Sequence, residues 1–153
     1  FTCGVTEAGT ENSGIMKSAA GIGSLLLDGI GDTIRVSLTA DPVKEVETGI
    51  SLLSSLNIHN EGVTFTSCPT CGRTKIDLIN LANEAEKRLI GCRKKLKIAI
   101  MGCVVNGPGE AIDADIGVCG GDGLGIIFKK GKEVKRVPEA DLINELVEEV
   151  NMM

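Results

Sequence analysis

The sequence predicts an α/β protein, because strand-like apolar runs alternate with helical patterns through most of its 153 residues. Residues 3–6 are expected to form a short strand, and residues 13–27 a helix rich in Ala, Leu, Gly and Ile. A strand over residues 33–38 then leads to an Asp-Pro helix-start signal at residues 41–42. The helix that begins there carries apolar residues at helical spacing, namely Val43, Val46, Ile50 and Leu53. Residues 1–56 therefore predict two strand–helix units.

Residues 57–153 predict a second, α+β domain with a mixed sheet, after a polar joint rich in Asn and Gly. A strand over residues 63–66 precedes a helix at about residues 75–90, whose apolar face carries Ile76, Ile79, Ala82 and Leu89. Another strand is expected at residues 96–101. Short strands separated by glycine-containing turns follow, at residues 116–119, 124–129 and 133–137. A last helix from Pro138 is expected to bury Leu142, Leu146, Val147 and Val150.

Composition excludes several classes of function. A net charge of −5, three Phe and no Trp or Tyr leave neither a basic footprint nor a stacking platform for nucleic acid. No apolar run approaches the roughly 20 residues that span a bilayer. The absence of a signal-peptide pattern, with Lys- and Glu-rich helices, points to the cytoplasm and to six free or metal-bound cysteines. Because the chain starts with Phe1 inside a strand-like run, we expect a fragment of a longer protein.

Two loops carry the residues that point to a metal site. Cys68 and Cys71 form a C-x-x-C pair just after one predicted strand, and Cys103 follows another in a glycine-rich loop that ends at Glu110. In α/β sheets, functional groups gather at the carboxyl ends of strands, so the two loops can converge. Thiolates are soft donors that favour iron–sulfur clusters. These four residues are therefore the candidate ligands of a cluster.

The cysteine pair alone leaves two alternatives. A C-x-x-C between a strand and a helix is also the motif of thioredoxin-like dithiol oxidoreductases, and on the pair alone the two interpretations are equal. Cys103 in its glycine-rich loop favours the metal site. A non-catalytic zinc-binding interaction module fits less well, because structural zinc usually takes four Cys or His ligands, whereas this second loop offers one Cys and a carboxylate.

Four segments resemble the 4-hydroxy-3-methylbut-2-enyl diphosphate synthase family: residues 6–9, 29–38, 67–74 and 102–110. The resemblance runs along nearly the whole chain. It implies a [4Fe-4S] oxidoreductase of the non-mevalonate isoprenoid pathway. Enzymes of this family open 2-C-methyl-D-erythritol 2,4-cyclodiphosphate reductively and remove a hydroxyl, with two electrons from ferredoxin or flavodoxin.

The resemblance also implies a role for each matching residue. The cysteines at 68, 71 and 103 would hold three irons and Glu110 the fourth, with the carboxylate corner exchangeable for substrate oxygen. Arg35 and Ser37 would bind the diphosphate, Glu7 would pass a proton to the departing hydroxyl, and Asn106 would lie near cluster and substrate. From the residues alone, Arg35 and Ser37 belong to a solvated strand face, Glu7 is a carboxylate after a strand, and Asn106 is equally a turn residue.

Architecture and partners follow from the resemblance too. Residues 1–56 resemble the last two strand–helix units of a TIM barrel, followed by the iron–sulfur domain. The family implies a homodimer, and this fragment alone is expected to be inactive. A basic run at residues 88–97 could dock an acidic electron carrier or be only a solvated rim. The remaining thiols, Cys3, Cys92 and Cys119, are expected to be buried or incidental.

Overall fold

The computed structural model describes residues 1–153 except 60–61, 106–108, 110 and 122. The chain divides into two compact units, Phe1–Asn60 and Glu61–Met153, and each is described by itself. The division falls shortly after the predicted domain boundary at residues 56 and 57. The functional limits of the two domains stay a prediction.

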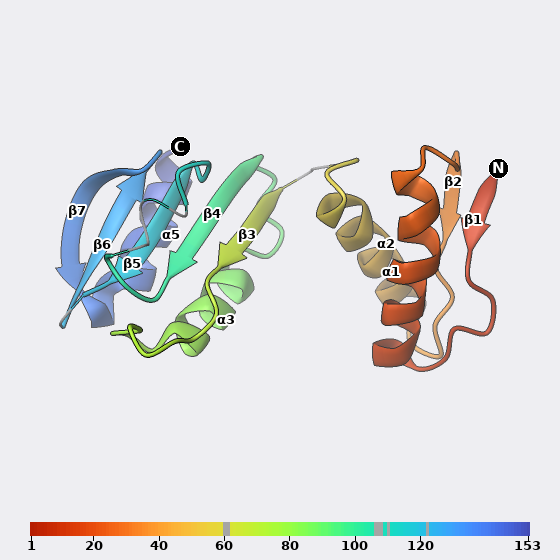
Figure 1. Ribbon diagram of the computed structural model, residues 1–153, viewed down its shortest axis with the longest axis horizontal. Helices are drawn as coiled ribbons and strands as arrows, with labels where there is room; N and C mark the ends of the chain where they lie inside the picture. Colours follow the sequence, from red (N-terminus) through yellow and green to blue (C-terminus); the bar gives the residue numbers. More distant parts are fainter. Residues whose placement is uncertain (60–61, 106–108, 110, 122) are drawn as a thin grey trace. The chain divides into compact units, whose positions relative to one another are not determined.

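The first unit contains two strand–helix repeats in the predicted order (Figure 1). Strand β1 (Thr2–Gly4) is followed by helix α1 (Glu11–Leu27), and β2 (Thr33–Arg35) by α2 (Pro42–Ser55). The two strands pair in parallel, as expected for repeated strand–helix units. Strand β2 is shorter than predicted, because its pairing with β1 ends at Arg35. Farther along, an isolated parallel bridge joins Thr10 to Thr39.

Helix α2 starts where its sequence signal predicts. The Asp41 carboxylate accepts a hydrogen bond from the Val43 N–H at 2.8 Å, and Pro42 occupies the first turn, where its missing N–H costs nothing. The periodic apolar residues of α2, however, do not all form the core. Gly49 and Leu52 are the buried positions, whereas the side chains of Val43, Val46 and Ile50 are exposed, since no described element of this unit packs over them.

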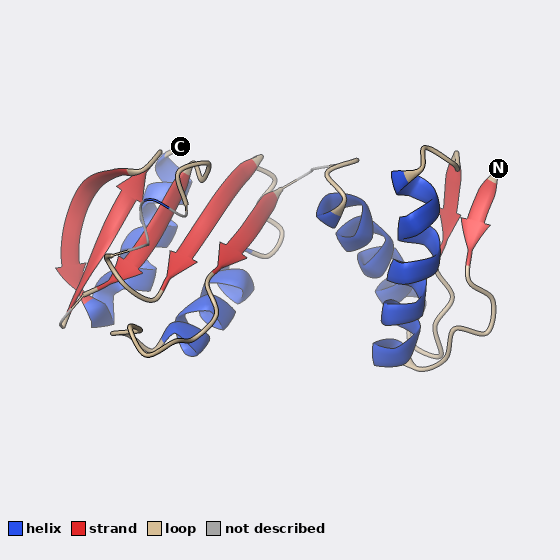
Figure 2. Ribbon diagram, viewed as in Figure 1, coloured by secondary structure: helices blue, strands red, loops and turns tan. Residues whose placement is uncertain are grey.

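The second unit is built on a five-stranded mixed sheet, which confirms the predicted fold class (Figure 2). The strands lie in chain order, and β3, β4 and β5 run parallel, while β5, β6 and β7 are antiparallel. Their bounds are Val63–Ser67, Leu96–Met101, Ile116–Gly120, Leu124–Lys129 and Lys132–Pro138. Parallel strands β3 and β4 therefore present their carboxyl ends at the same edge.

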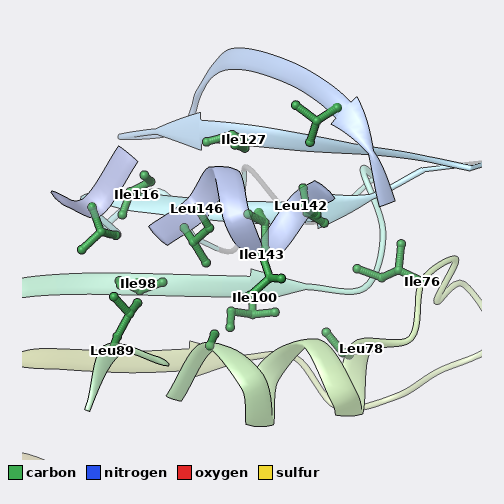
Figure 3. Close-up of a cluster of buried hydrophobic side chains, with 14 residues drawn as sticks. Ile76, Leu78, Leu89, Ile98, Ile100, Ile116, Ile127, Leu142, Ile143 and Leu146 are labelled. Atoms are coloured by element: carbon green, nitrogen blue, oxygen red, sulfur yellow. The ribbon is translucent and has the colours of Figure 1, made fainter. Parts of the chain in front are cut away.

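Helices α3 (Leu78–Leu89) and α5 (Leu142–Met152) cover one face of this sheet. Figure 3 shows their apolar side chains packed with alternate residues of the central strands. The buried side chains shared between helices and sheet include Leu78, Leu89, Ile98, Ile100, Ile116, Ile127, Leu142 and Leu146. The intervening strand residues form a smaller cluster with two alanines from the segment between β4 and β5. Its members are Ala99, Met101, Ala111, Ala114, Cys119 and Phe128.

The predicted helix at residues 75–90 begins later and turns a different face inward. Asp77 caps it by accepting from the Asn80 N–H at 3.3 Å, so the helix starts at Leu78. Ile79, predicted to be on the buried face, is 61% exposed, and the buried helical positions are Leu78, Ala85 and Leu89. Ile76 is buried as predicted, but it lies in the loop before the helix.

The last helix also begins later than predicted. Residues Glu139–Asp141 form a 3₁₀ turn after Pro138, and the α-helix starts at Leu142. Three of its four predicted core residues, Leu142, Leu146 and Val150, are buried, and Val147 is partly buried against the same cluster.

Candidate functional site

Both cysteine loops leave the same edge of the sheet. Cys68 follows β3 directly, and its N–H donates to the Ile100 carbonyl on β4 at 3.4 Å. Cys103 follows the end of β4 by two residues. Because β3 and β4 are adjacent parallel strands, residues more than thirty positions apart in the chain come together at their carboxyl ends.

Gly102 joins the two loops. Its N–H donates to the Cys68 Sγ at 3.2 Å, and its carbonyl accepts from the Lys75 N–H at 2.9 Å. A Cβ at Gly102 would lie only 2.9 Å from the Thr74 Oγ1 and 3.0 Å from the Thr74 Cγ2. Glycine is therefore required here by close packing, and this packing keeps Cys103 next to the C-x-x-C loop.

A tight turn holds the second cysteine of the pair. The Cys71 N–H donates to the Thr74 Oγ1 at 3.1 Å, and the Thr74 N–H donates to the Cys71 carbonyl at 3.0 Å. The backbone N–H of Arg73, and next the Thr74 hydroxyl, lower the pKa of the exposed Cys71 thiol, because both stabilise the thiolate. The thiolate is the form that binds metal.

Two further thiols differ strongly from Cys71 in their surroundings. Cys103 is 8% exposed, and Cys119 on β5 is fully buried. Burial raises the pKa of Cys119 to about 11, with a smaller contribution from the nearby Cys103. Cys119 is therefore a neutral thiol at ordinary pH, and its burial agrees with the expectation of a buried thiol.

The donor set is chemically suited to an iron–sulfur cluster, because thiolates are soft ligands. All six cysteines are free of disulfides, so the thiols at 68, 71 and 103 are available as ligands. Within the part of the chain that the structure describes, no group of three His, Cys, Asp or Glu side chains is arranged to hold a metal ion. In a [4Fe-4S] cluster each ligand binds a different iron, so its ligands need not meet at one point. The predicted fourth ligand, Glu110, and the predicted substrate contact, Asn106, lie outside the described residues.

The first unit brings two of its predicted site residues to one end of its strands. Gly4 on β1 pairs with Arg35 on β2, and the Arg35 Nη2 donates to the Thr6 Oγ1 at 2.8 Å. Glu7 follows in an exposed turn with φ of 59°, a left-handed conformation that is uncommon outside glycine and often marks functional positions. Ser37 lies two residues after β2 and is partly buried.

Thr6 is a contact that the sequence interpretation did not select as a site residue. Thr6 belongs to the 6–9 segment, and the only sequence feature that could have indicated a site role for it is its position beside Glu7. Gly4 also contributes, because a Cβ at this position would lie 2.8 Å from the Arg35 carbonyl oxygen. The Arg35 side chain is thus bonded to the Thr6 hydroxyl, and its backbone lies in close contact with Gly4.

The basic run does not lie beside the candidate ligand cysteines. Lys94 donates from Nζ to the carbonyl oxygens of Val150 and Asn151, at 2.9 and 2.6 Å, and so caps the end of α5. Arg88 donates to the Asn144 Oδ1 at 2.7 Å. Most of the run precedes β4 and Lys97 is the second residue of that strand, whereas Cys103 follows the strand; six strand residues span about 20 Å. An electron carrier that docked on this run would therefore be distant from the candidate ligands.

Two strand–helix units followed by a mixed-sheet domain with hydrogen-bonded cysteine loops define an α/β protein with a candidate metal centre. Residues 64–152 match the GcpE protein C-terminal domain, and residues 1–50 match the GcpE TIM-barrel domain. The chain belongs to the GcpE family. This confirms the predicted arrangement of a barrel segment followed by a second domain.

Several curated relatives carry the name 4-hydroxy-3-methylbut-2-en-1-yl diphosphate synthase (flavodoxin). The protein from Clostridium tetani is 62% identical over 147 residues, which cover 96% of this chain and 42% of the relative. The Geobacter sulfurreducens protein is 57% identical over 147 residues (96% and 42%), and that of Brevibacillus brevis 54% over 148 residues (97% and 41%). The chain therefore spans about two fifths of the length of these relatives.

The comparisons support the family resemblance inferred from the four sequence segments. As for membranes, none of the helices in the described ranges is both long and apolar enough to cross a bilayer.

Proposed function

We propose that this chain is part of a 4-hydroxy-3-methylbut-2-enyl diphosphate synthase, an oxidoreductase of isoprenoid biosynthesis by the non-mevalonate pathway. The substrate would be 2-C-methyl-D-erythritol 2,4-cyclodiphosphate. Two electrons and two protons enter and one water leaves. One carbon–oxygen bond to the cyclic diphosphate opens, the adjacent carbon–hydroxyl bond breaks, and a double bond forms between the two carbons. The observation that carries this proposal is the joining of the two cysteine loops at Gly102.

The residues that would hold a [4Fe-4S] cluster are Cys68, Cys71, Cys103 and Glu110. When bound, the cluster supplies electrons and an iron site that can accept a substrate oxygen in place of the carboxylate. The protein's own contribution is to orient the ligands. The Gly102 N–H faces the Cys68 sulfur, and donors around Cys71 favour its thiolate form.

The barrel segment would supply the groups that bind the substrate. Arg35 suits a diphosphate because a guanidinium donates through a planar fork, and its Nη2 donates to the hydroxyl of Thr6, the residue before Glu7. Glu7 would deliver a proton to the departing hydroxyl, with Ser37 and Asn106 as further substrate contacts. The relatives' names point to flavodoxin as electron donor, and ferredoxin remains the alternative. The homodimer and the cytoplasmic location remain predictions from the sequence.

The thioredoxin-like alternative has one supporting observation, since Cys71 is exposed and its pKa is lowered. In such dithiols, however, the cysteine pair sits at a helix N-terminus, whose dipole favours the thiolate. Here α3 begins only at Leu78, and the Cys68 sulfur already faces the N–H of Gly102 from the second loop. The geometry therefore favours a ligand role for the pair.

Anaerobic purification of the full-length protein that contains this chain tests the proposal. We expect a brown protein with broad absorbance at about 400 nm and about four irons per chain, active with reduced flavodoxin and the cyclic diphosphate. Cys68→Ser should lose iron and activity, whereas Cys92→Ala, a cysteine outside both loops, should retain them. A colourless protein with one zinc, or a metal-free protein with a reversible Cys68–Cys71 disulfide, would refute the proposal.

A further inference from the structure

The Thr74 side chain contacts both cysteine loops. Its Oγ1 accepts from the Cys71 N–H at 3.1 Å and lies 4.0 Å from the Cys71 Sγ, with the hydroxyl as donor. A hydroxyl has one proton and two lone pairs, so it can accept from the N–H and donate to the sulfur at the same time. Thr74 therefore links the backbone and the sulfur of one candidate ligand.

The same side chain fixes the position of the other loop. Thr74 packs directly over Gly102, where a Cβ would approach its Oγ1 to 2.9 Å. Gly102 in turn donates its N–H to the Cys68 Sγ at 3.2 Å. Movement of Thr74 would thus disturb the donors to two sulfurs, those of Cys71 and Cys68.

We propose that Thr74 is a positioning residue that tunes the reduction potential of the cluster; this inference rests on the proposed function. Reduction adds negative charge, and hydrogen bonds to the ligand sulfurs stabilise that charge and raise the potential. The Thr74 hydroxyl donates one such bond itself and, by packing over Gly102, holds the backbone N–H that donates the second. Loss of the hydroxyl should make the cluster harder to reduce.

The test uses the anaerobically reconstituted full-length protein and three variants. Thr74→Val keeps the shape and removes the hydroxyl, whereas Thr74→Ser keeps the hydroxyl and removes the methyl. Thr66→Val is the matched control, because Thr66 is an exposed residue of β3 outside both loops. The midpoint potential is measured by redox titration with electron paramagnetic resonance of the reduced cluster, and iron content is measured in parallel.

Thr74→Val should retain its iron but have a more negative midpoint potential. We expect the reduction equilibrium to weaken on the order of tenfold, which corresponds to about 59 mV for a one-electron couple. Thr74→Ser and Thr66→Val should have the wild-type potential. If Thr74→Val does not hold a cluster, Thr74→Ser decides: a wild-type potential supports the hydroxyl's role, and a shifted potential or a lost cluster refutes it.

Failure of this inference can be told apart from failure of the proposed function. A wild-type protein without iron would overturn both. A wild-type cluster whose potential is unchanged in Thr74→Val would overturn only the role of Thr74.

Discussion

Replacement of Gly102 by alanine tests whether close packing between the two loops holds the candidate ligands together. The new Cβ would lie 2.9 Å from the Thr74 Oγ1, 3.0 Å from its Cγ2 and 3.3 Å from the Leu78 Cδ2. Overpacking of this kind costs about 1–3 kcal/mol of folding free energy. For a domain of this size each kcal/mol lowers Tm by roughly 4–8 °C. The strain is relieved most directly by separation of the loops, which would break the N–H donation to the Cys68 sulfur.

Gly102→Ala should therefore lower both the unfolding free energy and the iron content of the full-length protein, measured by urea denaturation and by iron assay after anaerobic reconstitution. Gly72→Ala is the matched control, since a Cβ at Gly72 meets nothing within 4 Å and its φ is not positive. A double-mutant cycle with Thr74→Ala isolates the contact, because the alanine at 102 should cost less when the Thr74 atoms are gone. Equal costs in both backgrounds, or a neutral Gly102→Ala, would refute the packing argument.

Three further outcomes are expected. Lys94→Met should destabilise the protein by about 1 kcal/mol in urea denaturation, because two carbonyls at the end of α5 lose their donor. Lys95→Met, at an exposed position, should have little effect. Similar losses of stability in both variants would contradict the capping role of Lys94. In metal-free native protein, alkylation of Cys71 should persist to lower pH than that of an ordinary thiol, because its pKa is lowered and the thiolate is retained as the pH falls. Buried Cys119, with a pKa of about 11, should stay unmodified. Mass spectrometry of peptides measures the labelling of both cysteines, and equal labelling would contradict these expectations. Glu7→Gln should keep the visible absorbance of the cluster and lose turnover, and wild-type activity in that variant would exclude the proton-transfer role.

The regular elements were predictable where local patterns decide them. The strands at residues 96–101 and 124–129 were predicted with their observed bounds, because a continuous apolar run and flanking turns mark them clearly. Helix ends were less accurate, since Asp77 delays the start of α3 and a 3₁₀ turn delays α5. The inward face of α3 was wrong at Ile79, because helical spacing alone does not tell which side the sheet will cover.

The candidate site was likewise predictable only in part from the sequence. The sequence predicted that both cysteine loops follow strands whose carboxyl ends lie at one edge of the sheet, and the parallel pairing of β3 and β4 agrees. It could not predict that Thr74 packs on Gly102, or that Arg35 bonds to Thr6, because these contacts join residues from different strand–loop segments and depend on strand register. The left-handed backbone of Glu7 also has no sequence signal, since glutamate does not favour that conformation.

The capping of α5 by Lys94 has a practical consequence for labelling. The bonds to Val150 and Asn151 keep the final turn of the chain near the start of β4, whereas Cys103 lies beyond the other end of that strand. A purification tag or fluorescent reporter fused after Met153 would therefore emerge at the end of the sheet away from Cys68 and Cys103. Fusion at this end should leave metal loading undisturbed, provided that the last turn of α5 is kept intact.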